Sequence, residues 1–403
     1  MPSVERSKTV VAVYLSGMLV GISLILFPSA GSLFTDANFH HLNSAQFGVL
    51  FTPQIVTAIA SSVLTASVAR YTSMKRVLQI GLIFSALAML LLVISNFTFG
   101  SVWVFPLLLM ATGAMGAGFG FTISALNAYA FDLFPTASDT AVTAIHVMTG
   151  IGQIGASVLL SGFLGMGVWW GAPLTIALTI ALMIVFQSPL PLGLQAEHAT
   201  SQPDASSTQR DGRNLPLRVW LFALVTFTYG AIEGTFGNWI PIYLEQSANL
   251  TSIEAALGLS LFWTAVTTGR VLFAIAAVRL NVKPLFFITP FVVGAVFMLL
   301  PFLNGTFAHY MALFGVGLAI SYFFPYSVSL ASTEFPWLAA TVSGLLVAGL
   351  QLGNGVSANI VGIASQSIGL ATIFQSSTVY AVGMAVVVLY LGGTRSQVNS
   401  RGE

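Results

Sequence analysis

One acidic residue, Glu233, lies in the middle of a hydrophobic segment, FTYGAIEGTFGNWIPIYLEQ. An ionisable group in hydrocarbon costs several kcal/mol, so such residues are rare and indicate a function. A carboxylate in this setting suits two kinds of chemistry: it can accept hydrogen bonds from sugar hydroxyls, or it can load and release a proton. The structural alternative is a glutamate that is permanently paired or protonated and holds helices together.

Aromatic and small residues surround this carboxylate at helical spacing. Tyr229, Glu233, Phe236 and Gly237 share one face of a helix by their i, i+4, i+7, i+8 positions. Glu233 lies fifteen residues after Arg218, which at ~1.5 Å rise per residue places it near the centre of a bilayer. A carboxylate flanked by rings suits a sugar, whose apolar face stacks on the rings while the acid accepts its hydroxyls, and it equally suits the loading and release of a proton.

A second charge, Arg270, also lies inside an apolar segment. It comes nine residues before Arg279, roughly 13 Å along a helix. Arginine does not lose its proton, so it requires acceptors. The depth difference predicts no tight pair with Glu233 and leaves a longer-range interaction open. A gating or structural role and a substrate contact are both open.

His146 is the one histidine that we expect inside a membrane segment. It shares a face with Gly150 and Gln153 by i, i+4, i+7 spacing. A neutral histidine can bind a hydroxyl or relay a proton near physiological pH. The alternative is a hydrogen bond that ties two helices together.

Four amide side chains fall near the middle of their segments. Buried amides offer paired donors and acceptors that match sugar hydroxyls. Any one of them alone is explained by packing between helices, but two in each half of the chain at one depth indicate a site. These residues are Gln54, Gln153, Gln351 and Asn354.

Several classes of function are not supported by the sequence. The chain contains no cysteine, which excludes disulfides and thiolate metal sites. It has no glycine-rich phosphate loop, metal-ligand cluster, nucleophile constellation or basic nucleic-acid patch. We therefore expect no enzyme, no cofactor, no metal and no nucleic-acid partner.

The elements that must position these residues are membrane helices. Of the 403 residues, 56% are hydrophobic and 6% charged, far from the roughly 25% charged residues of soluble domains. Four long runs carry no Asp, Glu, Lys or Arg, and a span needs roughly 20 apolar residues. We predict an all-α protein of twelve spans, at 9–34, 45–69, 77–95, 102–130, 140–163, 168–188, 217–244, 252–278, 285–303, 307–330, 338–364 and 370–392.

The basic residues support this count independently. With the N-terminus inside, twelve of the thirteen Lys and Arg residues fall in cytoplasmic connections, and the thirteenth, Arg270, lies within a span. Cytoplasmic loops are enriched in these residues. The predicted protein therefore has both termini in the cytoplasm. We expect it in a bacterial inner membrane, as a monomer in contact with the bilayer and a small-molecule solute.

The chain divides into two halves around one polar segment. Residues 189–216 are rich in Ser, Gln, Asp and Gly, which predicts a flexible cytoplasmic linker. It separates a six-helix bundle at 1–188 from a second at 217–403. Weak internal similarity supports a repeat with an offset of 201, because Phe134-Pro135 recurs as Phe335-Pro336 and Gly152 recurs as Gly353. Parallel six-span repeats place a substrate site at their interface near mid-membrane.

Glycines and prolines predict close packing and breaks in these helices. Glycines in the fourth and fifth spans allow close backbone approach, although small residues commonly pack membrane helices. Prolines should kink or end helical turns, and gating motions often use such breaks. The prolines concerned are Pro28, Pro53, Pro241, Pro290 and Pro325.

Four short stretches carry a family pattern. They are Asn127-Ala128-Tyr129; Ile145-His146 with Gly150-x-Gly152; Tyr229-Gly230 with Glu233, Trp239 and Tyr243-Leu244; and Leu261-Phe262-Trp263 with Gly269-Arg270. Together they resemble the fucose–galactose–glucose:proton symporter branch of the major facilitator superfamily and its related glucose transporters. The resemblance implies two pseudo-symmetric bundles that expose a central site to each side in turn.

The sequence also departs from that pattern. Ala69 to Arg76 keeps basic charge between spans two and three but lacks the acid and glycine usual in the superfamily, and Ser157 stands where span five usually has proline. Acids are absent from span one and from the middle of span four. If protons are coupled, Glu233 must carry much of the coupling, which keeps facilitated diffusion open.

We therefore predict a secondary active or facilitative transporter of a small polar solute, in first place a sugar, with proton symport through Glu233 as one option. The main alternative is a proton-coupled exporter of drugs or other amphipathic compounds, which a buried acid among aromatic rings would suit; movement of lipids is also open. Proton coupling is assigned to Glu233 and His146, and a gating or structural charge to Arg270. The expected solute contacts are Gln54, Asn127, Gln153, Tyr229, Glu233, Asn238, Trp239, Trp263, Gln351 and Asn354.

Overall fold

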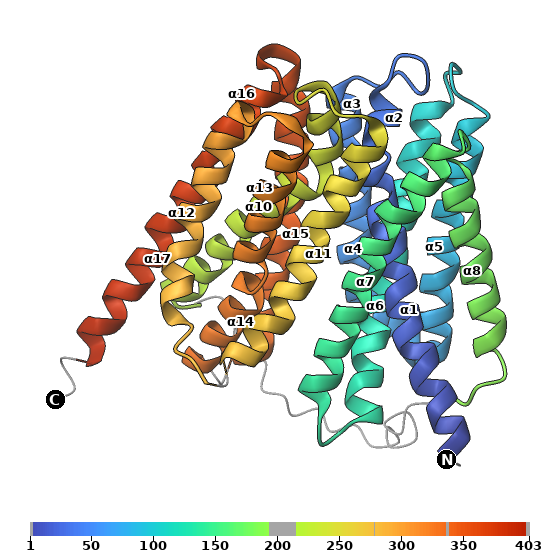
Figure 1. Cartoon of the computed structure of the whole chain (residues 1–403). Helices are drawn as coiled ribbons and strands as arrows, with labels where there is room; N and C mark the ends of the chain where they lie inside the picture. The colour runs from blue at the N-terminus through green and yellow to red at the C-terminus, as the bar shows by residue number, and fades with distance from the viewer. Residues whose placement is uncertain (1–2, 193–214, 278, 336–337, 400–403) are drawn as a thin grey trace. The chain divides into compact units, whose positions relative to one another are not determined.

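The computed structural model describes residues 3–192, 215–277, 279–335 and 338–399 (Figure 1). Throughout these residues the regular structure is helical and contains no strand. Most of the predicted linker, at 193–214, lies outside the described residues. Contacts divide the chain into two compact units. Unit 1 is drawn from Met1–Ser206 and Ser252–Ser260, and unit 2 from Ser207–Thr251 and Leu261–Glu403.

Eleven stretches of helix among the described residues are long and apolar enough to cross a membrane, and α8 is a shorter apolar helix of 17 residues. This confirms the prediction of an all-helical membrane protein. The helices of the first half are α1 (Ser3–Ser29), α2 (Gly31–Thr35), α3 (Ser44–Val49), α4 (Phe51–Tyr71), α5 (Met74–Asn96), α6 (Val104–Leu133), α7 (Ser138–Gly165) and α8 (Gly171–Gln187).

The second half begins with the buried helix α10. The tenth span of the chain, Gly305–Glu334, is divided into α13 and α14. Its helices are α10 (Leu217–Gln246), α11 (Ser252–Ala277), α12 (Lys283–Leu299), η2 (Leu300–Phe302), α13 (Gly305–Ile320), α14 (Phe323–Glu334), α15 (Ala339–Ile368), α16 (Leu370–Ser376) and α17 (Thr378–Asn399). The first turns of α11 group with unit 1 and the rest of α11 with unit 2.

Basic side chains cap helix ends at one end of unit 1. A guanidinium nitrogen of Arg6 donates to the carbonyl oxygen of Leu133 at the end of α6, at 3.0 Å. Lys75 Nζ donates to the carbonyl oxygens of Ser188 and Leu190, after α8, at 2.7 and 2.8 Å. Cations at helix C-termini satisfy free carbonyls and complement the helix dipole. The start of α1, the α4–α5 turn and the ends of α6 and α8 therefore meet at the same end of the unit.

Glycines set a close helix crossing in unit 1, between α1 and α7. A Cβ atom on Gly152 would lie 2.0 Å from the carbonyl oxygen of Met18, and a Cβ on Gly21 would lie 2.0 Å from that of Thr149. No side chain fits at these distances. The two backbones can therefore touch only because glycine occupies both positions.

The same crossing recurs in unit 2, between α10 and α15. A Cβ atom on Gly353 would lie 2.0 Å from the carbonyl oxygen of Phe227. A Cβ on Gly230 would lie 2.1 Å from that of Leu350. Because Gly230 precedes Glu233 by one turn, this crossing fixes where the buried carboxylate lies.

The two crossings correspond residue by residue. The offset of 201 indicated by the sequence carries the α7 contacts onto those of α15, and an offset of 209 carries the α1 contacts onto those of α10. Phe134 and Phe335, also 201 apart, end α6 and α14 with similar backbone angles, φ −133° ψ 59° and φ −127° ψ 63°. The internal repeat is therefore present in the backbone.

A second pair of helices repeats in the same way. A Cβ atom on Gly116 of α6 would lie 1.9 Å from the carbonyl oxygen of Gln54 in α4. A Cβ on Gly317 of α13 would lie 2.7 Å from that of Phe262 in α11. The offset of 201 relates the two glycines, and an offset of 208 relates α4 to α11.

Candidate functional site

The candidate site of unit 2 is built on α10. Most side chains of this helix between Val219 and Leu244 are buried, because α15 crosses it at Gly230 and Gly234 and α17 also packs against it. Glu233 stands at that crossing and is only 8% exposed. A buried carboxylate requires hydrogen bonds or a charge partner, and the structure provides both.

Glu233 contacts a tyrosine and an arginine. The Tyr229 hydroxyl donates to Glu233 Oε1 at 3.3 Å, as the i, i+4 spacing predicts. Arg270 Nη2 lies 3.8 Å from the same oxygen. The prediction that Arg270 makes no tight pair with Glu233 is therefore wrong. Counting depth along straight helices neglects the length of the arginine side chain, which spans the difference.

Arg270 has a further acceptor where the tenth span is interrupted. Its Nε donates to the backbone carbonyl oxygen of Ser321 at 3.2 Å. Helix α13 ends at Ile320 and α14 begins at Phe323. Pro325 explains the interruption, because proline has no N–H to bond the carbonyl four residues earlier, which is that of Ser321. The break predicted at this proline is confirmed.

Aromatic rings cover the tyrosine of this site. The Tyr229 ring stacks on Phe323 and Phe324, with centroids 6.0 Å away in both cases. These two rings are the first residues after the break. Phe236, expected on the same face as Glu233, instead packs against Phe297 at 4.6 Å in a separate core cluster. The aromatic neighbours of the site therefore come from α14.

Two further predicted residues meet one turn along α10. Asn238 Nδ2 donates to Asn354 Oδ1 of α15 at 3.0 Å. Near this pair, the Trp263 ring lies so close to α10 that a Cβ on Gly237 would be 3.1 Å from it. The indole Nε1 of Trp263 is buried and has no hydrogen-bond partner among the described residues.

The remaining candidates of unit 2 lie on α10 and α15. Trp239 is fully buried in α10, and Gln351 is half-buried on α15. Within the described residues, Gln351 makes no side-chain hydrogen bond.

The candidates of unit 1 come from three different helices. Gln54 lies on α4, Asn127 on α6 and Gln153 on α7. Gln54 Oε1 and Asn127 Oδ1 are buried and lack a hydrogen-bond partner within the described part of the chain. Gln153 is 9% exposed. No hydrogen bond joins these amides to one another, whereas in unit 2 Asn238 and Asn354 form a bonded pair.

The histidines differ from the prediction. His146 is exposed on α7, although Gly150 and Gln153 on its predicted face are buried. It is not the single histidine of the spans, because His309 of α13 also lies in one and is 2% exposed. His309 Nδ1 pairs with the carbonyl oxygen of Gly305 at 2.9 Å near the end of its span, which accounts for a polar ring there.

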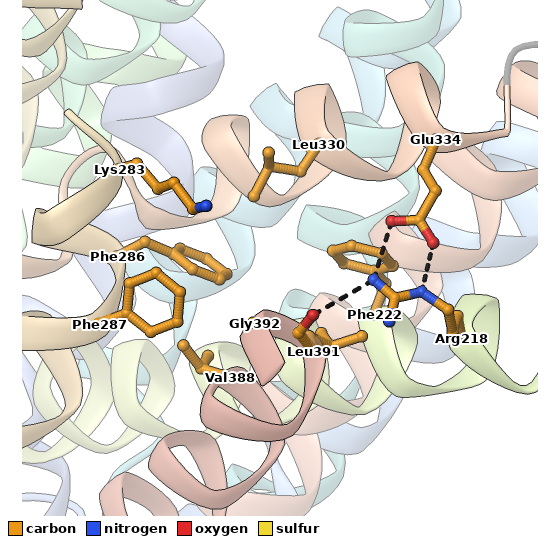
Figure 2. Close-up of a pocket in the computed structure, with 10 residues that line it drawn as sticks. All are labelled: Arg218, Phe222, Lys283, Phe286, Phe287, Leu330, Glu334, Val388, Leu391 and Gly392. Carbon is orange, nitrogen blue, oxygen red and sulfur yellow. Dashed lines mark hydrogen bonds and ion pairs between the residues drawn. The ribbon is translucent and has the colours of Figure 1, made fainter. Parts of the chain in front are cut away.

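Figure 2 shows a second polar cluster of unit 2, where α10 begins. Arg218 makes a two-point ion pair with Glu334, the last residue of α14, and donates to the carbonyl oxygen of Leu391 in α17 at 3.4 Å. Lys283 and Phe286 line the adjoining cavity. Its volume of about 30 Å³ holds about two waters, so it is too small for a hexose. The cluster ties the start of α10 and the end of α14 to the backbone of α17.

Sequence reasoning missed three parts of the site: the Ser321 carbonyl, the rings of Phe323 and Phe324, and the Asn238–Asn354 bond. The first two had a signal in Pro325, since a proline inside a span frees a carbonyl that some donor must satisfy. The asparagine pair had none, because no spacing rule relates residues on α10 to residues on α15.

Comparisons with known proteins agree with this architecture. The family model of the Major Facilitator Superfamily matches residues 10–358. The glucose/mannose transporter GlcP of Bacillus subtilis (strain 168) is 22% identical over 314 residues, which cover 75% of this chain and 77% of that protein.

Solved structures extend the likeness in fold. A D-xylose-proton symporter superposes with a TM-score of 0.74 at 14% identity, covering 95% of this chain and 96% of the symporter. The nucleoside transporter NupG superposes with a TM-score of 0.72 at 19% identity, covering 97% of this chain and 99% of NupG. The family match spans most of the described helices, so the chain belongs to the Major Facilitator Superfamily and is a multi-pass membrane transporter rather than an enzyme.

Proposed function

We propose that this transporter moves a sugar or sugar-like solute by alternating access, with proton symport through Glu233. The observation that carries the proposal is the buried Glu233 carboxylate, which has the Tyr229 hydroxyl at 3.3 Å and the Arg270 guanidinium at 3.8 Å. The names of the similar glucose/mannose transporter and D-xylose-proton symporter support a sugar.

A neutral polar solute fits this site better than a lipophilic cation. The guanidinium of Arg270 lies against the carboxylate, so an incoming cation would meet a positive charge as well as the acid. The indole N–H of Trp263 is a buried donor that has no acceptor among the described residues. A solute rich in hydroxyl groups supplies acceptors for such a donor and for the free atoms of the Asn238–Asn354 pair.

Proton coupling follows from the two partners of the Glu233 carboxylate. When Glu233 is ionised, Arg270 attracts it; when it takes up a proton, that attraction is lost. The carboxylate is therefore neutralised either by the Arg270 guanidinium or by a proton. Acidic residues inside membrane segments commonly mark proton pathways. His146 is assigned to the same pathway as a second proton carrier, because an imidazole can accept and release a proton.

The proposal also assigns solute contacts to unit 1 and an orientation to the chain. The buried side-chain oxygens of Gln54 and Asn127, which have no partner in the part of the chain that the structure describes, support solute contacts there, together with Gln153. The chain is proposed to have six-helix bundles at 1–188 and 217–403, to lie in an inner membrane as a monomer, and to keep both termini in the cytoplasm. The placement of Lys and Arg supports this orientation.

Counterflow tests the substrate without requiring a proton gradient. Proteoliposomes preloaded with an unlabelled hexose or deoxyhexose are diluted into the same labelled sugar. We expect saturable uptake that is absent from empty liposomes. No uptake across the panel, in protein shown to be folded, contradicts a sugar substrate; a second panel of lipophilic cations then tests the alternative of drug export.

A further inference from the structure

The break in the tenth span leaves a backbone carbonyl that a side chain from another helix binds. Pro325 stands in the first turn of α14 and has no N–H for Ser321, four residues earlier. Ser321 and Tyr322 nevertheless keep helical backbone angles, φ −52° ψ −45° and φ −92° ψ −12°. The break is therefore a hinge within a nearly continuous helix rather than a loop.

Arg270 satisfies that carbonyl and the carboxylate with one side chain. Its Nε faces Ser321 O at 3.2 Å, and its Nη2 faces Glu233 Oε1 at 3.8 Å. A guanidinium presents five donors in a rigid fork, so two acceptors on different helices are held in a fixed relation to each other. A lysine, with one ammonium group, cannot reproduce this fork.

Close packing of α11 against the hinge restricts the Arg270 side chain to this approach to the Ser321 carbonyl. A Cβ atom on Gly269, the preceding residue, would lie 2.4 Å from Ser321 Oγ. On the other side, the Tyr322 hydroxyl hydrogen-bonds Thr289 of α12, and its ring stacks on Phe273 at 4.4 Å. The hinge is therefore held between α11 and α12, with Arg270 as its charged contact.

We propose that Arg270 is a positioning residue that couples the protonation of Glu233 to the bend of the tenth span at Ser321–Tyr322. The ionised carboxylate holds the guanidinium in place, and the guanidinium holds the hinge carbonyl. A proton on Glu233 releases one end of this link, so α14 and its rings on Tyr229 change position relative to α10. This inference rests on the proposed role of Glu233 as the proton carrier.

Few charged groups take part in this link. Among the described residues, Tyr229 of α10 and Arg270 of α11 are the titratable or charged groups that face Glu233. Helix α15 contributes Asn354 and Ser357, whose atoms pack against Gly234. The hinge itself contributes Tyr322, whose hydroxyl is bonded to Thr289.

Spin labels test whether the hinge follows protonation. The chain contains no cysteine, so a pair of introduced cysteines at the exposed positions Thr333 of α14 and Val386 of α17 can be labelled without background. Double electron–electron resonance in acidic and alkaline buffer then measures the distance distribution between them. A control pair replaces Thr333 with Phe307, which lies on α13 before the hinge and is exposed.

We expect the Thr333–Val386 distribution to shift between acidic and alkaline buffer and the control pair to stay constant. Glu233→Gln should fix the distribution found in acid. Arg270→Gln should abolish the shift although Glu233 is intact, and Arg270→Lys should broaden the distribution at both pH values. Arg279→Gln removes an exposed positive charge beyond the end of α11 and should leave the shift unchanged.

Pro325→Ala provides a second test that keeps Arg270 and Glu233. The restored N–H bonds Ser321 within the helix, so we expect one distribution at every pH. A shift that persists in Arg270→Gln, or in Pro325→Ala, overturns the inference. Counterflow on the same preparations separates the two proposals: wild-type counterflow without a pH-dependent shift contradicts the hinge coupling alone. A wild-type shift that survives Glu233→Gln contradicts Glu233 as its trigger, and lack of sugar counterflow contradicts the substrate.

Discussion

The α1–α7 crossing of unit 1 and the α10–α15 crossing of unit 2 share a backbone geometry and differ in chemistry. The offset of 209 that aligns α1 with α10 pairs Leu24 with Glu233, and the offset of 208 that aligns α4 with α11 pairs Ser62 with Arg270. At each crossing the distances from an added glycine Cβ to the facing carbonyl oxygen agree to about 0.1 Å. The repeated backbone therefore supplies the framework, and substitutions within one copy supply the charges.

The continuity of one span differs in the same way. Helix α6 runs unbroken over 30 residues, whereas the corresponding span of unit 2 is divided into α13 and α14. At the offset of 201, Pro325 corresponds to Ser124, which keeps its backbone N–H. Charge and hinge thus occur in the same copy, where Arg270 joins them. Coupling of protonation to a helix bend requires the charge pair and the hinge to be in the same unit. A charge pair that only stabilises the fold does not require a hinge beside it.

Breaking either crossing should have the largest effect. Gly152→Val and Gly353→Val each place a Cβ atom 2.0 Å from a backbone carbonyl oxygen of the facing helix. Overpacking of a core commonly costs about 1–3 kcal/mol, and occasionally more. Backbone atoms cannot rotate away, so we expect no monodisperse folded protein from either variant by fluorescence-detected size-exclusion chromatography.

The controls for these valines are Gly155→Ala on α7 and Gly344→Ala on α15, where a Cβ meets nothing within 4 Å. Both should elute and melt like the wild type. If Gly353→Val yields folded protein and Gly152→Val does not, the two crossings differ in energy although their Cβ-to-carbonyl distances are equal.

Removing the charge that distinguishes unit 2 should abolish accumulation. Glu233→Gln keeps the shape of the side chain but cannot exchange a proton, so we expect sugar uptake driven by a pH gradient to fall to equilibration while counterflow is less affected. The matched control is Leu24→Gln, which adds an amide at the corresponding position of unit 1 and should still accumulate the solute. Equal accumulation by Glu233→Gln and the wild type would exclude Glu233 as the coupling residue.

Polar contacts one turn further sharpen the comparison. Asn238, paired with Asn354, corresponds to Ser29, which is bonded to Ser157 at 2.7 Å. Hydrogen bonds between membrane helices average about 0.6 kcal/mol and reach about 1.7. If Asn238 contacts the solute, Asn238→Ala should raise the KM of counterflow roughly three- to twentyfold, whereas Ser29→Ala should lower only the melting temperature.

The same reasoning applies to the isolated amides. Gln153→Ala and Gln351→Ala should also raise the KM, but by less than Asn238→Ala. Asn238→Ala leaves Asn354 without its hydrogen-bond partner, whereas the two glutamine variants leave no protein group unpaired. The KM from counterflow and the melting temperature are measured on the same preparations. An unchanged KM in both variants would remove these residues from the solute site.

Sequence reasoning succeeded where one helix alone determines the outcome. The spans follow from apolar length, the Tyr229–Glu233 contact follows from i, i+4 spacing, and the repeat was visible in Gly152 and Gly353. It failed where two helices meet: the depth of Arg270 along its own helix could not reveal how far its side chain reaches toward Glu233. Such contacts depend on tilt and crossing angle, which apolar periodicity does not encode.

The smallest expected effect concerns an acid-sensitive contact in unit 1. His40, between α2 and α3, is 5% exposed; its Nε2 pairs with Ser95 Oγ at 3.0 Å, and its ring packs edge-on against Phe34 and Trp169. Burial lowers the pKa of His40 from 6.5 to about 4. In unit 2 the aromatic cluster of Phe236, Phe297 and Phe374 adjoins Tyr243, whose ring centroid lies 6.3 Å from that of His309.

The sign of the effect follows from where the proton binds. Because the pKa of His40 is lower in the folded state, the unfolded chain binds the proton more tightly, and stability falls as pH drops from about 6.5 towards 4. The loss is at most roughly 3 kcal/mol. His40→Gln should remove this part of the acid-induced drop in melting temperature, whereas Ser95→Ala removes only a hydroxyl and should retain it. If His40→Gln melts with the same pH dependence as the wild type, the acid sensitivity lies elsewhere in the chain.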